Sequence, residues 1–175
     1  MILFETPRLI IRMWKPTDLS AFQLLNADQM VMKYFPKVLS AAETTDFYAK
    51  IQTDFKTNGY GLYVVEAKST HEFLGFCGFN NVTFPVDFTP CVEIGWRLKQ
   101  SAWGQGFATE AARGCLNYAK NNLPFRTIYS FTSVFNHRSE NVMKKLGMQK
   151  VQEFYHPNLA KTNWLSKHVL YQLTW

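Results

Sequence analysis

The alternation of apolar and polar residues is clearest between residues 91 and 112 of this 175-residue chain. Around Ile94 and Trp96, apolar side chains occupy every second position, and this period of two predicts a β-strand over 92–98. After a short break, Gly104-Gln105-Gly106 precedes a run of strong helix formers that predicts a helix ending near residue 122. The chain is therefore expected to pass from a strand through a glycine turn into a helix.

The rest of the chain shows the same two periodicities, a period of two for strands and an i, i+3, i+4 spacing for helices. Strands are expected over 9–14, 61–68, 72–82, 127–133, 148–155 and 168–175, and helices over 16–26, 41–58 and 136–147, with a short helical piece over 29–34. Ser40 and Glu43 form a capping-box pattern at the start of the second helix. Residues 83–90 are expected to form a loop that either shapes the edge of a pocket or simply connects two strands. This order of elements predicts a mixed sheet with helices on its faces.

A glycine turn between a strand and a helix can hold a phosphate. Glycine lets the backbone approach the anion, and the N–H groups of the first helical turn point at it. A tight connection without any ligand fits the pattern equally well. The chain has no G-x-x-x-x-G-K-[ST] run, and Thr109 stands where a dinucleotide fingerprint has its third small residue. Besides the P-loop and the dinucleotide-binding turn, a glycine turn between a strand and a helix can bind a third phosphate ligand, acyl-CoA.

The composition is that of a globular protein, with 47% hydrophobic and 16% aromatic residues. No apolar run approaches the ~18 residues of a membrane span, and the first residues lack the charged-then-apolar order of a signal peptide. Cys77, Cys91 and Cys115 show neither a disulfide framework nor metal-ligand spacing. We therefore expect one cytoplasmic domain over residues 1–175, without a metal.

The net charge of +6 comes from Lys and Arg residues that are scattered along the chain and form no block. A solubilising surface charge explains this balance best. A polyanionic small molecule or a nucleic acid would also suit it.

Four motifs occur together over nearly the whole chain. They are ETPRL at 5–9, EIGWRL with WGQGFATEA at 93–111, NHRS with KLGM at 136–148, and HP with HVLY at 156–171. In this combination they resemble the GNAT superfamily of acyl-CoA N-acyltransferases. More narrowly, they resemble its Rim-type branch, the ribosomal-protein N-terminal acetyltransferases. In the superfamily pattern Q/R-x-x-G-x-G/A, Trp103 takes the first place here, as is usual for this branch.

The resemblance implies an α/β (α+β mixed) GNAT-type fold, with a mostly antiparallel sheet of about seven strands, a splayed central pair and flanking helices. It implies transfer of an acetyl group from acetyl-CoA to a primary amine, on a protein N-terminus or a small molecule, by direct attack. The central strand would hold the pantetheine arm and the glycine turn the pyrophosphate. The residues so assigned to the cofactor are Trp96, Arg97, Leu98, Trp103, Gly104, Gln105, Gly106, Phe107, Ala108, Thr109, Asn136, Ser139 and Asn141. The side chains of Arg97, Lys144 and Lys145 are candidates to pair with CoA phosphates, although a solvated surface charge is favoured for each alone.

Glu93 is the candidate general base, acting through a water, although an ion pair or a structural hydrogen bond fits it equally well. An α-amine with a pKa near ~8 is already partly neutral, whereas a lysine near ~10.4 must give up its proton at a cost of roughly 4 kcal/mol. Deprotonating an α-amine acceptor therefore requires only a weak general base. Ser139 is the candidate to hydrogen-bond the departing thiolate, although helix capping is favoured for it. In many members of the superfamily that the chain resembles, a tyrosine after the last helix acts as the acid toward the departing thiolate. No tyrosine lies between Tyr129 and Tyr155 here, so the general acid is unassigned.

Two other functions fit parts of the sequence. One is a non-catalytic acyl-CoA sensor on the same fold, and the other, suggested only by the positive charge, is a nucleic-acid-binding accessory protein. The acceptor pocket would come from the first helices and from loops near Phe35, 83–90 and 155–167, where His156-Pro157 is expected to form a turn. These regions contain no motif that identifies an acceptor in this family, so the sequence does not identify the amine acceptor. Both a monomer and a homodimer are compatible with the chain.

Overall fold

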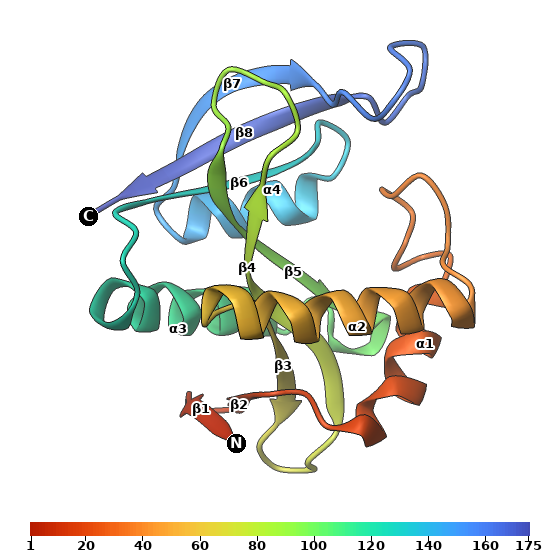
Figure 1. Cartoon of the computed structure of the whole chain (residues 1–175), viewed down its shortest axis with the longest axis vertical. Helices are drawn as coiled ribbons and strands as arrows, with labels where there is room; N and C mark the ends of the chain where they lie inside the picture. The colour runs from red at the N-terminus through yellow and green to blue at the C-terminus, as the bar shows by residue number, and fades with distance from the viewer.

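The structure, a computed structural model, describes all 175 residues and contains an eight-stranded sheet with four α-helices (Figure 1). The strands are β1 (Ile2–Glu5), β2 (Leu9–Arg12), β3 (Leu62–Ala67), β4 (Phe73–Val82), β5 (Cys91–Leu98), β6 (Thr127–Ser133), β7 (Gln149–Tyr155) and β8 (Lys167–Thr174). The helices are α1 (Leu19–Ala27), α2 (Ala41–Asn58), α3 (Phe107–Asn122) and α4 (His137–Lys145), and short 3-10 turns at Pro16–Asp18 and Gln100–Ala102 precede α1 and α3.

The predicted mixed sheet and its four long helices are confirmed, and two details of the prediction are wrong. Ile2–Glu5 pairs with β2 and adds an eighth strand, which the pattern missed because four residues are too few to display a period. The helical piece expected over 29–34 is a series of turns. There the Asp28 carboxylate accepts from the N–H groups of Met30 and Val31, and such local bonding competes with a helix.

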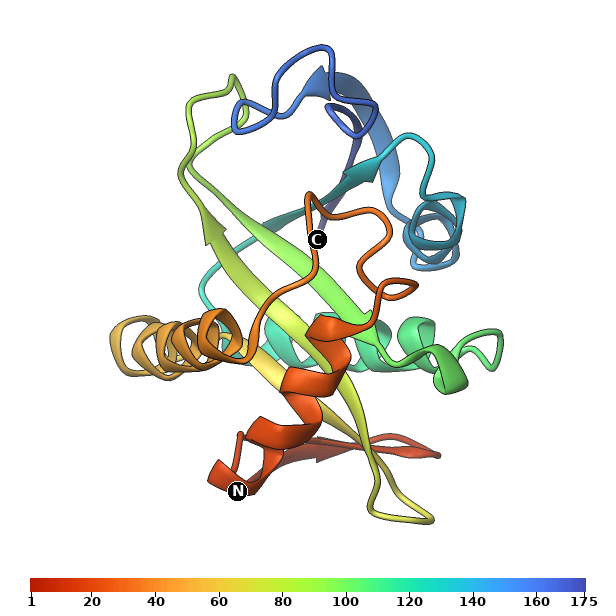
Figure 2. The same cartoon turned by 90° about the vertical axis from the view of Figure 1, so that its right-hand side faces the viewer.

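The sheet has the order β1-β2-β3-β4-β5-β6-β8-β7, and every neighbouring pair is antiparallel except β5 and β6. β5 pairs with β4 from Cys91 to Leu98, but it is in register with β6 only at Glu93 and Tyr129. The two central strands therefore diverge after their first contact, as expected of a splayed pair. Figure 2 shows the twisted sheet from the side, with β6, β7 and β8 above and β1 and β2 below.

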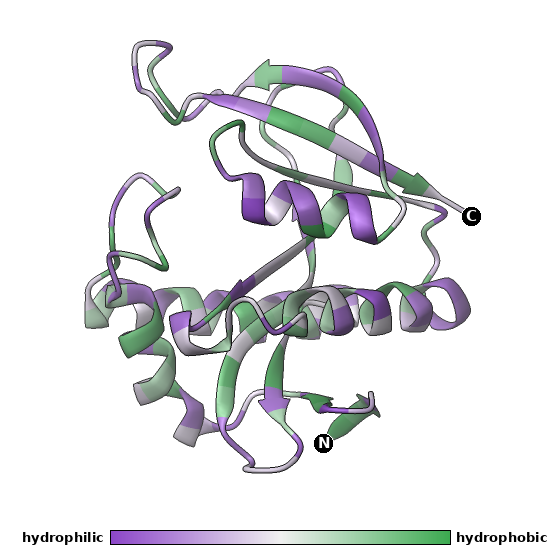
Figure 3. Ribbon diagram, turned by 180° about the vertical axis from the view of Figure 1, so that it is seen from behind, coloured by the Kyte–Doolittle hydropathy of each residue, from purple (hydrophilic) through white to green (hydrophobic).

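Helices cover both faces of the sheet, because alternate residues of the central strands are apolar on both sides. Tyr63 and Val65 pack in one core cluster with Cys115 of α3. Val64, which lies between them in β3, packs instead with Phe22 of α1 and Ile51 of α2. The apolar residues of the central strands thus lie between two helical layers (Figures 2 and 3). None of the helices has the length and apolar character that crossing a membrane requires.

A buried ion pair joins the first strand of the core to the turn before α1. The Arg12 guanidinium donates to Asp18 through Nη1 and Nη2, both at 2.8 Å, and to Glu66 through Nε at 2.6 Å. Burial opposes ionisation of Asp18, but the hydrogen bonds from Arg12 and from the Lys15 N–H outweigh it and lower the pKa of Asp18. At neutral pH, both carboxylates therefore stay ionised around the buried cation.

Asp18→Asn should lower the free energy of unfolding at pH 7 by about 3 kcal/mol, because it leaves the Arg12 charge buried with one partner fewer. The Asp18 contribution is present above the pKa of an unfolded aspartate and disappears as the pH falls through the lower folded pKa. The variant should therefore show a shallower loss of stability on acidification, measured by urea unfolding. Asp54→Asn removes an exposed pair with Lys50 and should cost less than about 1 kcal/mol. Equal losses in the two variants would contradict this account.

Candidate active site

The turn between β5 and α3 presents a row of unpaired backbone N–H groups. Gly104 and Gly106 have φ angles of +75° and +81°, in the left-handed region that glycine adopts at least cost. Trp103 anchors the turn by donating its indole N–H to the Leu98 carbonyl at 2.8 Å. None of the N–H groups from Gly104 to Thr109 donates a hydrogen bond within the protein, and no side chain caps α3. The turn is therefore a concave set of donors at the positive end of a helix, suited to an anion.

The N-terminal segment holds this turn in place. The Glu110 carboxylate accepts from the Thr6 hydroxyl at 2.6 Å, from the Arg8 N–H at 2.9 Å and from Arg8 Nε at 2.7 Å. Arg8 also donates to the carbonyl of Gln105 at 2.9 Å, and its guanidinium stacks on the Phe107 ring at 4.4 Å. Burial opposes ionisation of Glu110, but the bonds from Thr6 and Arg8 outweigh it and lower its pKa. The motif at 5–9 thus positions the glycine turn, a role that the sequence reasoning did not assign.

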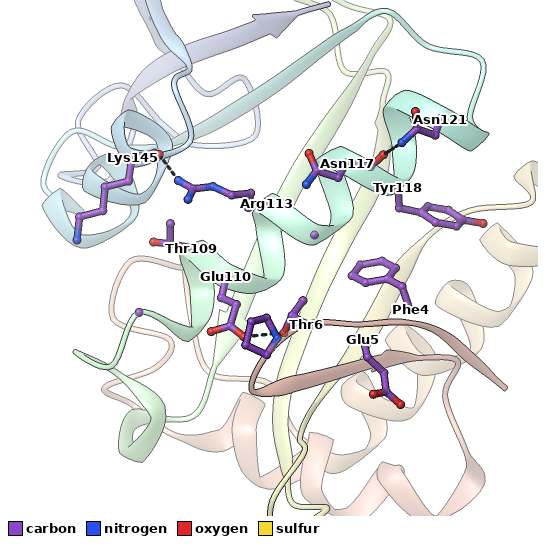
Figure 4. A pocket seen from close by; sticks show the side chains of 13 residues that line it. Phe4, Glu5, Thr6, Thr109, Glu110, Arg113, Asn117, Tyr118, Asn121 and Lys145 are labelled. Atoms are coloured by element: carbon purple, nitrogen blue, oxygen red, sulfur yellow. Dashed lines mark hydrogen bonds between the residues drawn. The ribbon is translucent and has the colours of Figure 1, made fainter.

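A groove of about 780 Å³ runs from Gly106 along the outer side of α3 (Figure 4). Arg113 and Lys145 line one end, where Arg113 donates to the Lys145 carbonyl at 2.7 Å. Phe4 and Tyr118 stack at the other end, with ring centroids 5.7 Å apart. The groove therefore begins at the unpaired N–H groups and has cations beside them.

The divergence of β5 from β6 leaves part of the β5 backbone unpaired. The Ser130 hydroxyl donates to the Ile94 carbonyl at 2.9 Å, so the main-chain groups of Ile94 point towards β6. Because main-chain orientation alternates along a strand, the N–H and C=O of Trp96 point the same way. No residue of β6 is in register with Trp96. An extended ligand can therefore pair with β5 at this position, next to the glycine turn.

Glu93 lies on the opposite face of β5 from the core residue Ile94, with Asn80 and Tyr129 as its cross-strand neighbours. Burial raises the pKa of Glu93 to about 8, against a hydrogen bond from Asn80 that lowers it. Since Glu93 forms no ion pair, the structure does not support the ion-pair alternative. A carboxylate with this raised pKa is a stronger base than an ordinary one, and it titrates near neutral pH.

The residues predicted on α4 are engaged in capping that helix. Asn136 accepts from the Ser139 N–H at 3.3 Å and is the N-cap of α4, whereas Ser139, for which capping was favoured, contributes only its backbone N–H to this bond. The Asn136 amide donates to Thr132 Oγ1 at 3.0 Å and to Ser139 Oγ at 3.2 Å, so every polar atom of that side chain has a partner within the protein. The Ser139 hydroxyl accepts a bond but donates none, and its proton remains free. Asn141 is exposed on the same helix.

The basic candidates for CoA phosphates lie in different places. The Arg97 side chain packs against Phe35 and Phe76, on the sheet face opposite α3, so it does not point at the glycine turn. Lys144 pairs with Glu140 at 3.2 Å. Lys145 alone lines the groove that starts at Gly106.

An aromatic cluster covers the same sheet face as Glu93 towards β7 and β8. The loop over 83–90 supplies Phe84 and Phe88, which pack on Phe131 at centroid distances of 5.8 and 6.3 Å. The His156 ring lies 4.7 Å from Phe84 and 5.1 Å from His168. Burial lowers the pKa of both histidines, that of His168 to about 4, so both are neutral at pH 7.

Residues 8–149 match the family model described as an acetyltransferase (GNAT) domain. The sequence is 33% identical to the uncharacterized protein YkkB of Bacillus subtilis strain 168 over 144 residues. This aligned region covers 82% of this chain and 83% of YkkB. The fold is similar to the crystal structure of a GNAT-family acetyltransferase from Bacillus anthracis, with a TM-score of 0.81, 24% identity and coverage of 99% and 98% of the two chains. It is also similar to RimL, a ribosomal L7/L12 α-N-protein acetyltransferase, in complex with coenzyme A, with a TM-score of 0.80, 18% identity and coverage of 99% and 98%.

The matched region contains the diverging strands, the glycine turn and α3, the elements that build the site described above. The mixed sheet with its single parallel central pair also agrees with the solved acetyltransferase structures. The protein therefore belongs to the GNAT acetyltransferase family.

Proposed function

We propose that this protein transfers an acetyl group from acetyl-CoA to a primary amine, with Glu93 as the general base. The observation that carries the proposal is one continuous segment. It places six unpaired N–H groups at Gly104–Thr109, an open strand edge at Trp96 and a carboxylate of raised pKa at Glu93. Anion binding, docking of an extended arm and proton removal are the three tasks that such a transferase requires.

Acetyl-CoA supplies an activated thioester and a pyrophosphate by which it can be held. The N–H groups from Gly104 to Thr109 suit the pyrophosphate, because their donors converge and lie at a helix N-terminus. The main-chain groups of Trp96 suit the amides of the pantetheine arm, in the manner of an added strand. Lys145 and Arg113 lie along the same groove and add positive charge for the remaining phosphate.

Glu93 would accept a proton from the acceptor ammonium, directly or through a water, and so produce the neutral amine that attacks. Its pKa of about 8 is close to that of an α-amine, so the transfer is nearly isoenergetic. The free hydroxyl proton of Ser139 is a donor for the sulfur that departs. A cofactor cradle together with a carboxyl group of raised pKa favours an enzyme over a non-catalytic acyl-CoA sensor, because a sensor would not require Glu93.

The motif resemblance supports a Rim-type acetyltransferase acting on a protein N-terminus, and a small-molecule amine is the other acceptor class that the site admits. We further propose that residues 1–175 work as one cytoplasmic domain, as a monomer or homodimer. The absence of a cationic block and the anion cradle on α3 favour a CoA thioester over a nucleic acid as the phosphate ligand.

Acetyl-CoA at 100 times its dissociation constant should raise the melting temperature by roughly 5–10 °C, since binding then adds about 2.7 kcal/mol to the folded state. Gly106→Ala should weaken binding at least about tenfold in calorimetry, because alanine resists the φ of +81° that shapes the turn. Gly59→Ala is the matched control, with a φ of +76° and nothing within 4 Å of the added carbon. Both variants should lose about 1–2 kcal/mol of stability, but only the first should lose affinity. Unchanged affinity in Gly106→Ala would argue against the cradle.

Glu93→Gln should reduce kcat by about 10²–10⁴-fold while leaving acetyl-CoA affinity unchanged, because it removes only the base. With a saturating acceptor whose amine has a pKa above the range, and which therefore binds as an ammonium, the wild-type kcat should increase with pH as Glu93 loses its proton near pH 8. The variant should lack this increase. Glu153→Gln, in an exposed cluster with Lys150 and Lys167, should leave both the rate and the profile unaltered. Full turnover by Glu93→Gln would exclude Glu93 as the base.

A further inference from the structure

Arg97 is a cation without a carboxylate partner. Its guanidinium lies 4.2 Å from the Phe35 ring centroid and 5.2 Å from that of Phe76, and its Nη1 donates to the side-chain oxygen of Asn26. It takes part in none of the salt bridges of the protein, whereas the buried Arg12 has two carboxylates and Arg8 has Glu110. Burial lowers the pKa of Arg97 to about 10, so the group remains charged at neutral pH.

The unused part of this guanidinium has a definite geometry. Nε is shielded from solvent and has no hydrogen-bond partner, and Nη2 donates no hydrogen bond within the protein. Nε and Nη2 form one edge of the planar group, the edge that matches both oxygens of a carboxylate. Asn26, itself fully buried, fixes the opposite side through Nη1 and donates in turn to Thr44 Oγ1 at 3.4 Å. This edge therefore has no hydrogen-bond partner within the protein, and a carboxylate would reach Nε once the atoms that cover it move aside.

Arg97 and Glu93 share one face of β5, because they lie four residues apart on a strand of period two. Gly95 lies between them, and a side-chain carbon added there would meet nothing within 4 Å. The face between the carboxyl and the guanidinium is thus open, over a Cα separation of about 13 Å for four extended residues. The acetyl-CoA cradle lies on the α3 side of the sheet, so this open face belongs to the other reactant.

Aromatic residues from three separate segments contact one another in a row that begins next to Phe35, whose ring lies against Arg97. Tyr34, next to Phe35 in the segment between α1 and α2, lies 6.3 Å from the ring of Trp164 in the β7–β8 connection. Trp164 in turn lies 5.7 Å from Phe135, which precedes α4. The rings of Phe35 and Phe76 beside the guanidinium strengthen any ion pair made by Arg97, because they limit its contact with water.

We propose that the acceptor is an amine that also carries a carboxylate, which Arg97 binds side-on while Glu93 meets the amine. This inference rests on the proposed acetyltransferase function and specifies its acceptor class. The side-on edge explains why a half-buried arginine lacks a protein carboxylate, and Gly95 supplies the room for the acceptor between the two charged groups. Polyamines, which have no anion, would place a like charge against Arg97.

The test compares oligoglycines of two, three and four residues with the same peptides as C-terminal amides. Both series have an α-amine of pKa near ~8, so they differ only in the carboxylate. Initial rates with acetyl-CoA should give at least a tenfold higher kcat/KM for the free acid of one or more lengths. Arg97→Gln should abolish this preference by slowing the acids and sparing the amides, and Arg97→Lys should keep part of it. Arg126→Gln, an exposed arginine, controls for the loss of one charge.

Acetyl-CoA affinity and melting temperature are measured for each variant alongside the rates. Equal rates for acids and amides at every length, equal slowing of both series in Arg97→Gln, or faster acetylation of spermidine than of every free acid would overturn the inference and leave the proposed function standing. Lack of acetyl-CoA binding, or of acetylation of any amine in the panel, would overturn the proposed function itself.

Discussion

The loss of pairing between β5 and β6 is the constraint on which the rest of the site depends. These strands share a single position in register, Glu93 with Tyr129, before they separate. A sheet interior that leaves main-chain groups unpaired is costly unless a ligand or solvent satisfies them. The fold confines this cost to Trp96 and to the following glycine turn, where unpaired N–H groups continue into the first turn of α3. The departure from regular pairing produces a strand edge, and the anion cradle of the glycine turn follows it directly in the chain.

The arginines of this protein show how burial and pairing separate structural from functional charge. Arg12 is satisfied by Asp18 and Glu66, and Arg8 by Glu110, so these two hold elements together. Arg97 is half-buried and has only the neutral Asn26 as a hydrogen-bond partner. Glu93 lies on the same face without a cation, and burial raises its pKa. A carboxyl and a guanidinium that are near in sequence and not paired with each other indicate a face prepared for an external partner.

Much of this fold could be predicted from the sequence, because the periodicities of strands and helices record burial directly. The glycine turn was also recognisable, because its two closely spaced glycines lie between a predicted strand and a predicted helix. Ile2–Glu5 could not be assigned, because its pairing with β2 is a property of the sheet and not of four residues. The clamp of Thr6 and Arg8 on Glu110 links residues more than 100 positions apart, and no local pattern reveals such a contact. The motif resemblance marked these residues without indicating what they do.

The side of the sheet that each residue faces was the main information that only the structure supplied for the site. Alternation along β5 places Arg97 with Glu93, and this separates Arg97 from the phosphate role considered for it. Asn136 was expected at the cofactor, but its amide is occupied in capping α4. These assignments depend on partners from distant segments, whereas the N–H groups of the glycine turn are available because of local backbone geometry alone.

The most direct measurement of this account is amide hydrogen exchange, resolved by residue, with and without saturating acetyl-CoA. The N–H groups of Gly104–Thr109 have no acceptor within the protein, and Trp96 has no partner in register on β6. The account predicts that all of these N–H groups become strongly protected when the cofactor binds. Protection confined to other segments, with these amides still exchanging at the rate of the free protein, would contradict it.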